Sequence, residues 1–280
     1  MRLGGTVAGR VNSAEEWEEK LVRSRFRAVT APFSCRTPRE EIRRYTAICE
    51  KHDVVIAELG VWKNPFDPDP AKAKAAMDYA KGQLALADEL GVACCVNIAG
   101  TASAKGWDAA DKSNFTKETY ARIVSSIREI IDSVKPKRAF YCLEPMPWMI
   151  PDGPDIYLKL IEDVSRAQFA AHMDFVNMLC TPRRWLGAED FVEECFRSLA
   201  PYIKSTHIKD SRMDALALTS HFDECAPGEG GLDFVKLLPI LDKYLSKDAP
   251  VLLEHMQTFE EYAKAYDYLA EKASAAGVEI

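Results

Sequence analysis

The chain alternates between short apolar runs and longer amphipathic stretches, and it does so eight times without a gap. Short apolar runs are typical of buried strands, and the stretches between them have helical length. The strand-like runs cover residues 2–8, 26–33, 54–61, 92–99, 139–144, 169–174, 203–207 and 251–254. Strand–helix alternation predicts parallel strands, and eight units predict a single closed (β/α)8 TIM barrel over residues 1–280. An open, doubly wound sheet is the alternative.

Helix ends and loop lengths agree with this order. Thr37-Pro38-Arg39-Glu40 predicts a helix start with Thr37 as the capping residue and Pro38 in the first helical position. Gly91 predicts the end of the helix over 71–90. Segments after strands are long (64–70, 100–114, 145–154, 175–185, 208–231), whereas those after helices are short. Barrel enzymes build their sites from the loops after the strands, so we expect the chemistry at that end.

Composition excludes several classes of protein. A net charge of -7 is unlike the basic surface of a nucleic-acid-binding domain. No apolar run reaches the roughly 18 residues that span a bilayer, and residues 1–5 do not resemble a signal peptide. The eight cysteines form no CxxC pair, which is typical of reduced and mostly buried thiols. We therefore expect a cytoplasmic enzyme acting on a small molecule, with no nucleic-acid or membrane partner.

Four apolar runs in the second half of the chain carry a potential metal ligand at or near their ends. These residues are Glu144, Asp174, His207 and Glu254, spaced 30 to 47 residues apart. If the strands are parallel neighbours, the four side chains meet at one mouth of the barrel. Three carboxylates and one imidazole form an oxygen-rich site suited to a divalent cation. The sequence thus predicts a metal centre.

Other polar residues on these strands are candidate substrate ligands. His172 shares a strand face with Asp174 and either orients a ligand or is a hydrogen-bonded core histidine, the reading we favour. Lys209 shares a face with His207, and its ammonium suits stabilisation of a substrate oxyanion. Glu58 ends the third strand, and we expect it across the barrel from the four ligands, binding substrate hydroxyls. Asp210 is expected to cap a turn or pair with a basic side chain.

The strand-end loops add aromatic residues that either stack on a sugar or anchor the loops against the barrel. They are Trp62, Phe66, Trp107 and Trp148. On the longest loop, Arg212, His221 and Glu224 are candidate substrate contacts. The glycine-rich segment 227–231 does not match a phosphate-binding loop, so we interpret it as the turn that starts the next helix.

The Glu, Asp, His, Glu order on the last four strands resembles the xylose-isomerase-like barrel superfamily, in particular its sugar phosphate isomerase/epimerase group. The sequences His-Ile-Lys-Asp at 207–210 and Pro-Gly-Glu-Gly at 227–230 resemble the same group, and the resemblance covers nearly the whole chain. It implies that Glu144, Asp174, His207 and Glu254 bind Mn²⁺, Mg²⁺, Co²⁺ or Zn²⁺, with Mn²⁺ favoured. By similarity to the ketose 3-epimerases, Glu144 and Glu254 also act as acid/base catalysts on opposite faces of the sugar carbon.

Two positions depart from the epimerase pattern. Asn177 stands where those enzymes usually place a substrate-binding histidine three residues after the aspartate. Lys209 belongs to a His-x-Lys-Asp pattern that the epimerases lack and that resembles dehydratase-like members and the metal-dependent subunit of C-glycoside deglycosidases. Both residues are therefore candidate substrate ligands, and both count against simple ketose 3-epimerisation.

The resulting hypothesis is a metal-dependent sugar isomerase or epimerase that removes a proton next to a carbonyl and passes through an enediolate. A metal-dependent lyase on a keto-sugar shares that intermediate and is the main alternative. An endonuclease-IV-like enzyme is disfavoured by the five histidines and the acidic charge, and a non-catalytic barrel by the intact ligand types. The sequence leaves open a homo-oligomer or a small partner subunit.

Overall fold

Eight parallel strands close into a barrel in the computed structural model, which describes all residues 1–280. Around the barrel the strands follow the order β1-β10-β7-β6-β5-β4-β3-β2. Their bounds are β1 (Arg2–Gly5), β2 (Ala28–Thr30), β3 (Val55–Gly60), β4 (Cys94–Asn97), β5 (Phe140–Leu143), β6 (Phe169–Asp174), β7 (Ile203–Ile208) and β10 (Pro250–Leu253). The closed barrel is confirmed and the open sheet is excluded, because β1 pairs with both β2 and β10.

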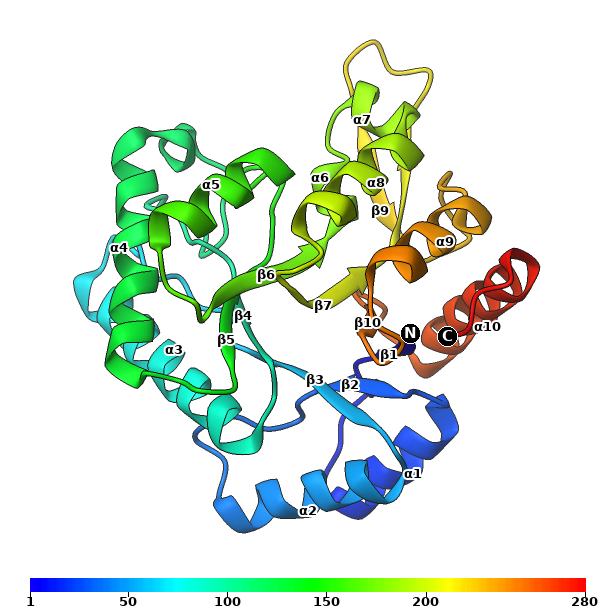
Figure 1. The fold of residues 1–280 in the computed structure, drawn as a ribbon, viewed down its shortest axis with the longest axis horizontal. Helices are drawn as coiled ribbons and strands as arrows, with labels where there is room; N and C mark the ends of the chain where they lie inside the picture. Colours follow the sequence, from blue (N-terminus) through cyan, green and yellow to red (C-terminus); the bar gives the residue numbers. More distant parts are fainter.

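Helices surround the barrel as an outer ring (Figure 1). The long ones are α1 (Ala14–Ser24), α2 (Arg39–Lys51), α3 (Pro70–Leu90), α4 (Lys117–Val134), α5 (Pro154–Val164), α8 (Ala188–Leu199), α9 (Phe234–Tyr244) and α10 (Phe259–Ala276). Short helical turns occupy loops after strands: η1 (Lys112–Phe115), α6 (Phe175–Met178) and α7 (Pro182–Leu186). The chain ends meet at the amino end of the barrel, where the Met1 amino group donates to the Glu279 carbonyl at 2.9 Å. No helix has the length and apolarity needed to span a membrane.

Two local predictions were wrong. Thr37 does not cap α2; the helix begins at Arg39 after Pro38, and the Thr37 hydroxyl instead accepts the Ser34 N–H at 3.0 Å. The segment 209–231 is not all loop, because β8 (Asp210–Met213) pairs antiparallel with β9 (Phe222–Cys225). This hairpin projects from the carboxyl end of the barrel, drawn in yellow (Figure 1). Gly91 ends α3 as predicted, in the left-handed conformation.

The core divides into an outer and an inner layer. Most buried apolar residues pack between the strands and the helices in one large cluster. Two small groups lie apart from it, and strand alternation places them inside the barrel: Ala28, Ala57 and Leu252, and Cys94, Val96, Cys142 and Ala170. These inner residues are mostly small, so the barrel has a narrow apolar floor beneath its polar mouth.

Two irregularities in strand register lie directly beneath the mouth. Between β2 and β3 the pairing moves from Val29–Ile56 to Thr30–Glu58, which leaves one extra residue on β3. Between β6 and β7 it moves from Ala171–Ile203 to His172–Ser205. Such bulges redirect the side chains that follow them. They determine which polar groups of β3 and β7 enter the barrel.

Candidate metal centre and active-site cavity

The four predicted ligands meet at the carboxyl end of four consecutive strands of the closed sheet. Glu144 follows β5, Asp174 ends β6, His207 lies in β7 and Glu254 follows β10. One donor atom from each lies within 4.8 Å of the donors of the other three. Residues far apart in the chain therefore converge because parallel strands deliver their carboxyl ends to one rim.

His207 stands at the centre of this cluster. Its Nδ1 lies 3.1 Å from Glu144 Oε1 and 2.8 Å from Glu254 Oε2. Burial opposes protonation of the imidazole, but the charges of Glu254 and Glu58 raise its pKa well above the ordinary value. The same negative charges would also attract a metal cation, which would compete with the proton for this position.

Lys209 enters the cluster from the hairpin side. Its side chain is buried, and Nζ lies 2.7 Å from Asp174 Oδ2, 2.5 Å from Glu254 Oε1 and 3.0 Å from Glu224 Oε2. Burial alone would lower the pKa of this ammonium, but the charges of Asp174 and Glu254 raise it well above the ordinary value. A buried charge is tolerated only when paired, and here the pairing is with three carboxylates.

Glu58 lies beneath the cluster and not across the barrel from it, so its predicted location was wrong. Its Oε1 is 3.1 Å from His207 Nε2, and its Oε2 accepts the Ser205 hydroxyl at 2.9 Å. Burial opposes ionisation, yet the nearby His207 holds the pKa of Glu58 below its ordinary value. The bulge in β3 explains the error, because Ala57 and Glu58 both face inward where strict alternation allows only one.

His172 packs beside His207, with ring centroids 4.2 Å apart and planes nearly perpendicular. The ring is completely buried, and neither nitrogen makes a well-aligned hydrogen bond. Its Nε2 nevertheless lies 3.2 Å from Glu58 Oε2. His172 is thus a core histidine that packs against the His207 ring and lies beside the Glu58 carboxylate.

The donor set fits a divalent cation. Ligands about 2.1 Å from one ion lie up to about 4.2 Å apart, close to the 4.8 Å spread of the four donors. Asp174 Oδ2 is buried and makes no well-aligned hydrogen bond, and its one ion-pair partner is the Lys209 ammonium at 2.7 Å. Burial and the charges of Glu254 and Glu144 outweigh Lys209 and raise the pKa of Asp174 well above its ordinary value. A divalent ion would relieve this repulsion, which is the electrostatic signature of a cation site.

A cavity of about 430 Å³ opens above the cluster. Of the four candidate ligands, only Glu144 and Glu254 line it. The cavity wall includes the indoles of Trp62, Trp107 and Trp148, together with Asn177. Trp62 and Asn177 thus lie where a substrate ligand would be expected. Asn177 is itself fixed, because its amide donates to the Pro145 carbonyl at 3.0 Å.

Some predicted contacts lie elsewhere. Arg212 is exposed on β8, 3.6 Å from Asp223, and does not line the cavity. His221 is exposed and also pairs with Asp223. Phe66 is buried beneath the Arg122 guanidinium, so it anchors its loop and offers no stacking surface.

Glu224 was predicted as a candidate substrate contact, but its pairing with His255 was not predicted. The Nδ1 of His255 lies 2.5 Å from Glu224 Oε1, and the other carboxylate oxygen of Glu224 contacts Lys209. His255 follows the end of β10 in a left-handed backbone conformation (φ 61°), so strand alternation does not give its direction. Glu224 reaches the cluster only because β8 and β9 form a hairpin. No local sequence signal indicated this contact.

Asp210 caps the glycine-rich turn as predicted. Its carboxylate accepts backbone N–H groups from Ser211, Gly228, Gly230 and Leu232 at 2.8 to 3.2 Å. A Cβ at Gly230 would collide with this carboxylate, so the close approach requires glycine. The segment 227–231 therefore closes the base of the hairpin.

Comparisons with known proteins agree with this architecture. The family model described as xylose isomerase-like TIM barrel matches residues 22–272. No curated protein matches the chain at significant similarity.

Solved structures with the same fold include a xylose isomerase-like TIM barrel protein from Mycobacterium smegmatis in complex with magnesium (13% identity, TM-score 0.69, covering 98% of this chain and 97% of that one). A D-psicose 3-epimerase solved in the presence of D-fructose is similar, with 14% identity and a TM-score of 0.69 over 99% of this chain and 100% of that one. The probable 3-DHS dehydratase AsbF from Bacillus anthracis is also similar, with 15% identity and a TM-score of 0.73 over 96% of this chain and 99% of that one. At these identities the structural matches establish the fold, and the family match extends over most of the sequence. The chain belongs to the xylose isomerase-like TIM barrel family.

Proposed function

We propose that the protein is a divalent-metal-dependent sugar isomerase or epimerase that moves a proton on the carbon next to a carbonyl. The observation that carries this proposal is that Glu144 and Glu254 alone among the four candidate ligands line the cavity. Two carboxylates facing one cavity beside a cation site suit removal and return of a proton. The D-psicose 3-epimerase structure supports the sugar substrate class by similarity of fold.

Glu144, Asp174, His207 and Glu254 would hold the ion; three carboxylates suit Mn²⁺ or Mg²⁺, and the resemblance to the family favours Mn²⁺. When bound, the ion supplies Lewis acidity that makes the C–H beside a carbonyl more acidic. Asp174 and His207 are the more deeply buried ligands and anchor the site. Glu58 positions His207 from below through its contact with Nε2.

The proton transfers belong to the two glutamates. The pKa of Glu254 lies well below its ordinary value because His207 and Lys209 outweigh the effect of burial. It is therefore ionised, which a general base must be before it can remove a proton from the substrate carbon. Glu144 faces the same cavity, with its Oε1 on the His207 side, and would return a proton to the opposite face or to the neighbouring carbon. Three indoles in the wall limit the access of water.

A keto-sugar lyase is the second candidate, and Lys209 is the observation that favours it. Its buried ammonium contacts Glu254 and also lines a neighbouring cavity of about 370 Å³ beneath the hairpin. In that position Lys209 could protonate a leaving group on the carbon beyond the enediolate. The dehydratase AsbF shares the fold.

Incubation with keto-sugars and Mn²⁺ in D₂O separates these candidates. An isomerase or epimerase places deuterium on the carbon beside the carbonyl in a product of unchanged composition. Loss of water or of an aglycone identifies a lyase. Turnover that persists after complete metal removal would contradict both.

The matched variants are Glu254→Gln and Glu229→Gln. Glu229 is an exposed glutamate paired with Lys264 outside the cluster. We expect Glu254→Gln to lower turnover by roughly 10²–10⁴-fold, as for loss of an acid/base group, and to reduce bound metal, whereas Glu229→Gln retains both. Equal metal content and turnover in the two variants would remove Glu254 from the site.

A further inference from the structure

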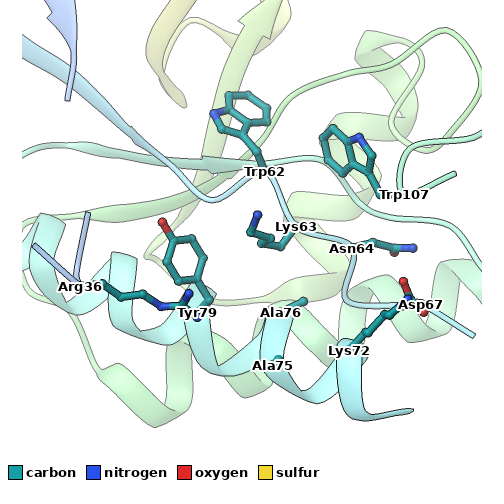
Figure 2. A pocket seen from close by; sticks show the side chains of 10 residues that line it. All are labelled: Arg36, Trp62, Lys63, Asn64, Asp67, Lys72, Ala75, Ala76, Tyr79 and Trp107. Atoms are coloured by element: carbon teal, nitrogen blue, oxygen red, sulfur yellow. The ribbon is translucent and has the colours of Figure 1, made fainter. Parts of the chain in front are cut away.

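A second cavity, of about 380 Å³, adjoins the active-site cavity (Figure 2). The two share the indoles of Trp62 and Trp107, which line both. The second cavity lies against α3 and the segments that follow β2 and β3. Figure 2 shows Lys63 and Tyr79 facing it below Trp62, with Arg36 and Lys72 at its edges.

The charge of this cavity is opposite to that of the metal centre. Arg36, Lys63 and Lys72 line it with a single carboxylate, Asp67. None of the three cations has an ion-pair partner, although the whole chain carries a net charge of -7 and has many acidic residues.

Three neighbouring basic residues that do not line the cavity are paired. Lys74 contacts Asp78 at 2.5 Å and Lys81 contacts Glu129 at 2.7 Å, both on the same helix as Lys72. Arg39, at the start of α2, contacts Glu89 at 2.8 Å. Three cations without an ion-pair partner therefore share one cavity wall, next to basic residues that are paired.

Tyr79 holds two of these cations in place. The Arg36 guanidinium lies 4.9 Å from the centroid of the Tyr79 ring, and Lys63 Nζ lies 5.9 Å from it. A cation over an aromatic face keeps its charge and its N–H groups available to a ligand. The two cations therefore lie near the same ring at the cavity wall.

Trp62 is fixed at the boundary between the cavities. Its backbone is left-handed (φ 46°), which is unusual for a bulky residue and is found at sites where the surrounding structure imposes it. The indole lies over Gly60, where any Cβ would collide with it. The ring thus forms part of the wall of both cavities.

We propose that this second cavity is an oxyanion subsite that binds a phosphate or carboxylate group at the distal end of the substrate. The reacting end would lie at Glu144 and Glu254, and the anionic end at Arg36, Lys63 and Lys72. The assignment of the bound anion to the substrate rests on the proposed function. An anion-binding subsite next to the proposed reaction centre narrows the substrate class to sugar phosphates or sugar acids. Guanidinium and ammonium groups are the side chains that bind such oxyanions.

Direct anion binding to the metal-free protein tests the subsite. Inorganic phosphate and gluconate are titrated by calorimetry against the parent, the double variant Arg36→Gln/Lys63→Gln and the control Arg39→Gln/Lys74→Gln. All four positions are exposed, so folding is retained. We expect the cavity variant to bind at least about 10-fold more weakly, since each hydrogen bond to a charged group contributes about 1.5–3 kcal/mol, and the control to bind as the parent does.

The outcomes separate the two anion sources and the two proposals. Cavity-dependent binding of phosphate supports a sugar phosphate, and cavity-dependent binding of gluconate alone supports a sugar acid. Binding of neither anion, or equal binding by the cavity and control variants, overturns the subsite. Because the titration needs no metal and no turnover, it succeeds or fails independently of the proposed chemistry. Glu254→Gln should bind the anion with the affinity of the parent.

Discussion

The two cavities that meet at Trp62 and Trp107 differ in both the sign and the environment of their charges. The metal centre has buried carboxylates that are balanced by Lys209 and His207. The second cavity has exposed cations without ion-pair partners. Burial explains the difference, because a desolvated charge must be paired while a solvated one need not be. The barrel interior is therefore suited to a cation, and the outer rim to an anion.

The two regions also come from different parts of the chain. The four candidate metal ligands belong to β5, β6, β7 and β10, in the second half of the sequence. The residues of the basic cavity belong to the segments after β2 and β3 and to α3, in the first half. Glu58 is an exception to this division, because it belongs to β3 in the first half of the chain but contacts His207 at the metal centre. Substitutions should therefore affect one binding function at a time, except at Glu58 and at the shared wall.

Asp174→Asn should have the largest effect. It removes one charged ligand, while asparagine retains the cap that Asp174 makes to the Asn177 N–H. Losing an outer partner of a ligand costs roughly 10–100-fold in metal affinity, so losing the ligand itself should cost more than about 100-fold. Mn²⁺ titration measures the effect, with exposed Asp223→Asn as the control. Phosphate binding should stay at the parental level, and a joint loss would mean that the two cavities are not independent.

Glu58→Gln should have the next largest effect, a loss of roughly 10–100-fold in metal affinity. Glutamine keeps the shape of the side chain but removes the charge that orients His207 through Nε2. Titration of Co²⁺, whose absorption reports ligand geometry, separates a displaced imidazole from a merely weaker site. An unchanged spectrum and affinity would limit Glu58 to filling the barrel floor.

Gly60→Ala tests the shared wall. The added Cβ would collide with the Trp62 indole and displace it from both cavities. We expect a rise of roughly 10-fold in KM for the sugar substrate, because one lost apolar contact has about this value. Metal content and kcat should change little. Trp62→Phe, which keeps a smaller ring at the same position, should fall between the parent and Gly60→Ala; a larger effect on kcat than on KM would contradict a role in binding.

Asp88→Ala provides a reference at the amino end of the barrel and should have the smallest effect on either cavity. The Asp88 carboxylate accepts the N–H groups of Lys137, Arg138 and Ala139 just before β5. Because water can replace the carboxylate at these largely exposed groups, the loss should be about 0.5–1.5 kcal/mol of stability. Urea unfolding gives the loss, and Mn²⁺ and phosphate titrations should remain unchanged.

The same carboxylate gives a pH dependence of defined sign. Burial opposes its ionisation, but the three N–H donors hold the pKa of Asp88 below its ordinary value of 3.8. Its contribution to stability is therefore complete above pH 3.8 and is lost as the pH falls through the lower folded-state pKa. Unfolding curves at pH 6 and pH 3 should differ more for the parent than for Asp88→Ala. Equal differences would show that these hydrogen bonds do not depend on the charge.

Local pattern was sufficient to predict much of the candidate site. Glu144, Asp174, His207 and Glu254 each follow or end an apolar run, and a period of two is enough to give the direction of Asp174 and His207. The same rule failed at Glu58, because a bulge depends on the pairing between two strands and leaves no mark in either one. The period of two also does not apply to the side chains of His255 and Trp62, because their backbones are left-handed.

The sequence by itself determined the eightfold strand–helix order, and hence the barrel and the rim at which the polar strand ends gather, because both follow from local periodicity and chain direction. Only the tertiary structure decided which groups touch. Closure of the sheet placed β5, β6, β7 and β10 side by side, the bulge brought Glu58 under His207, and the β8–β9 hairpin carried Glu224 to Lys209. The basic cavity likewise exists only because separate segments of the chain meet there. Contacts of this kind depend on distances between segments remote in the chain, which no local pattern specifies.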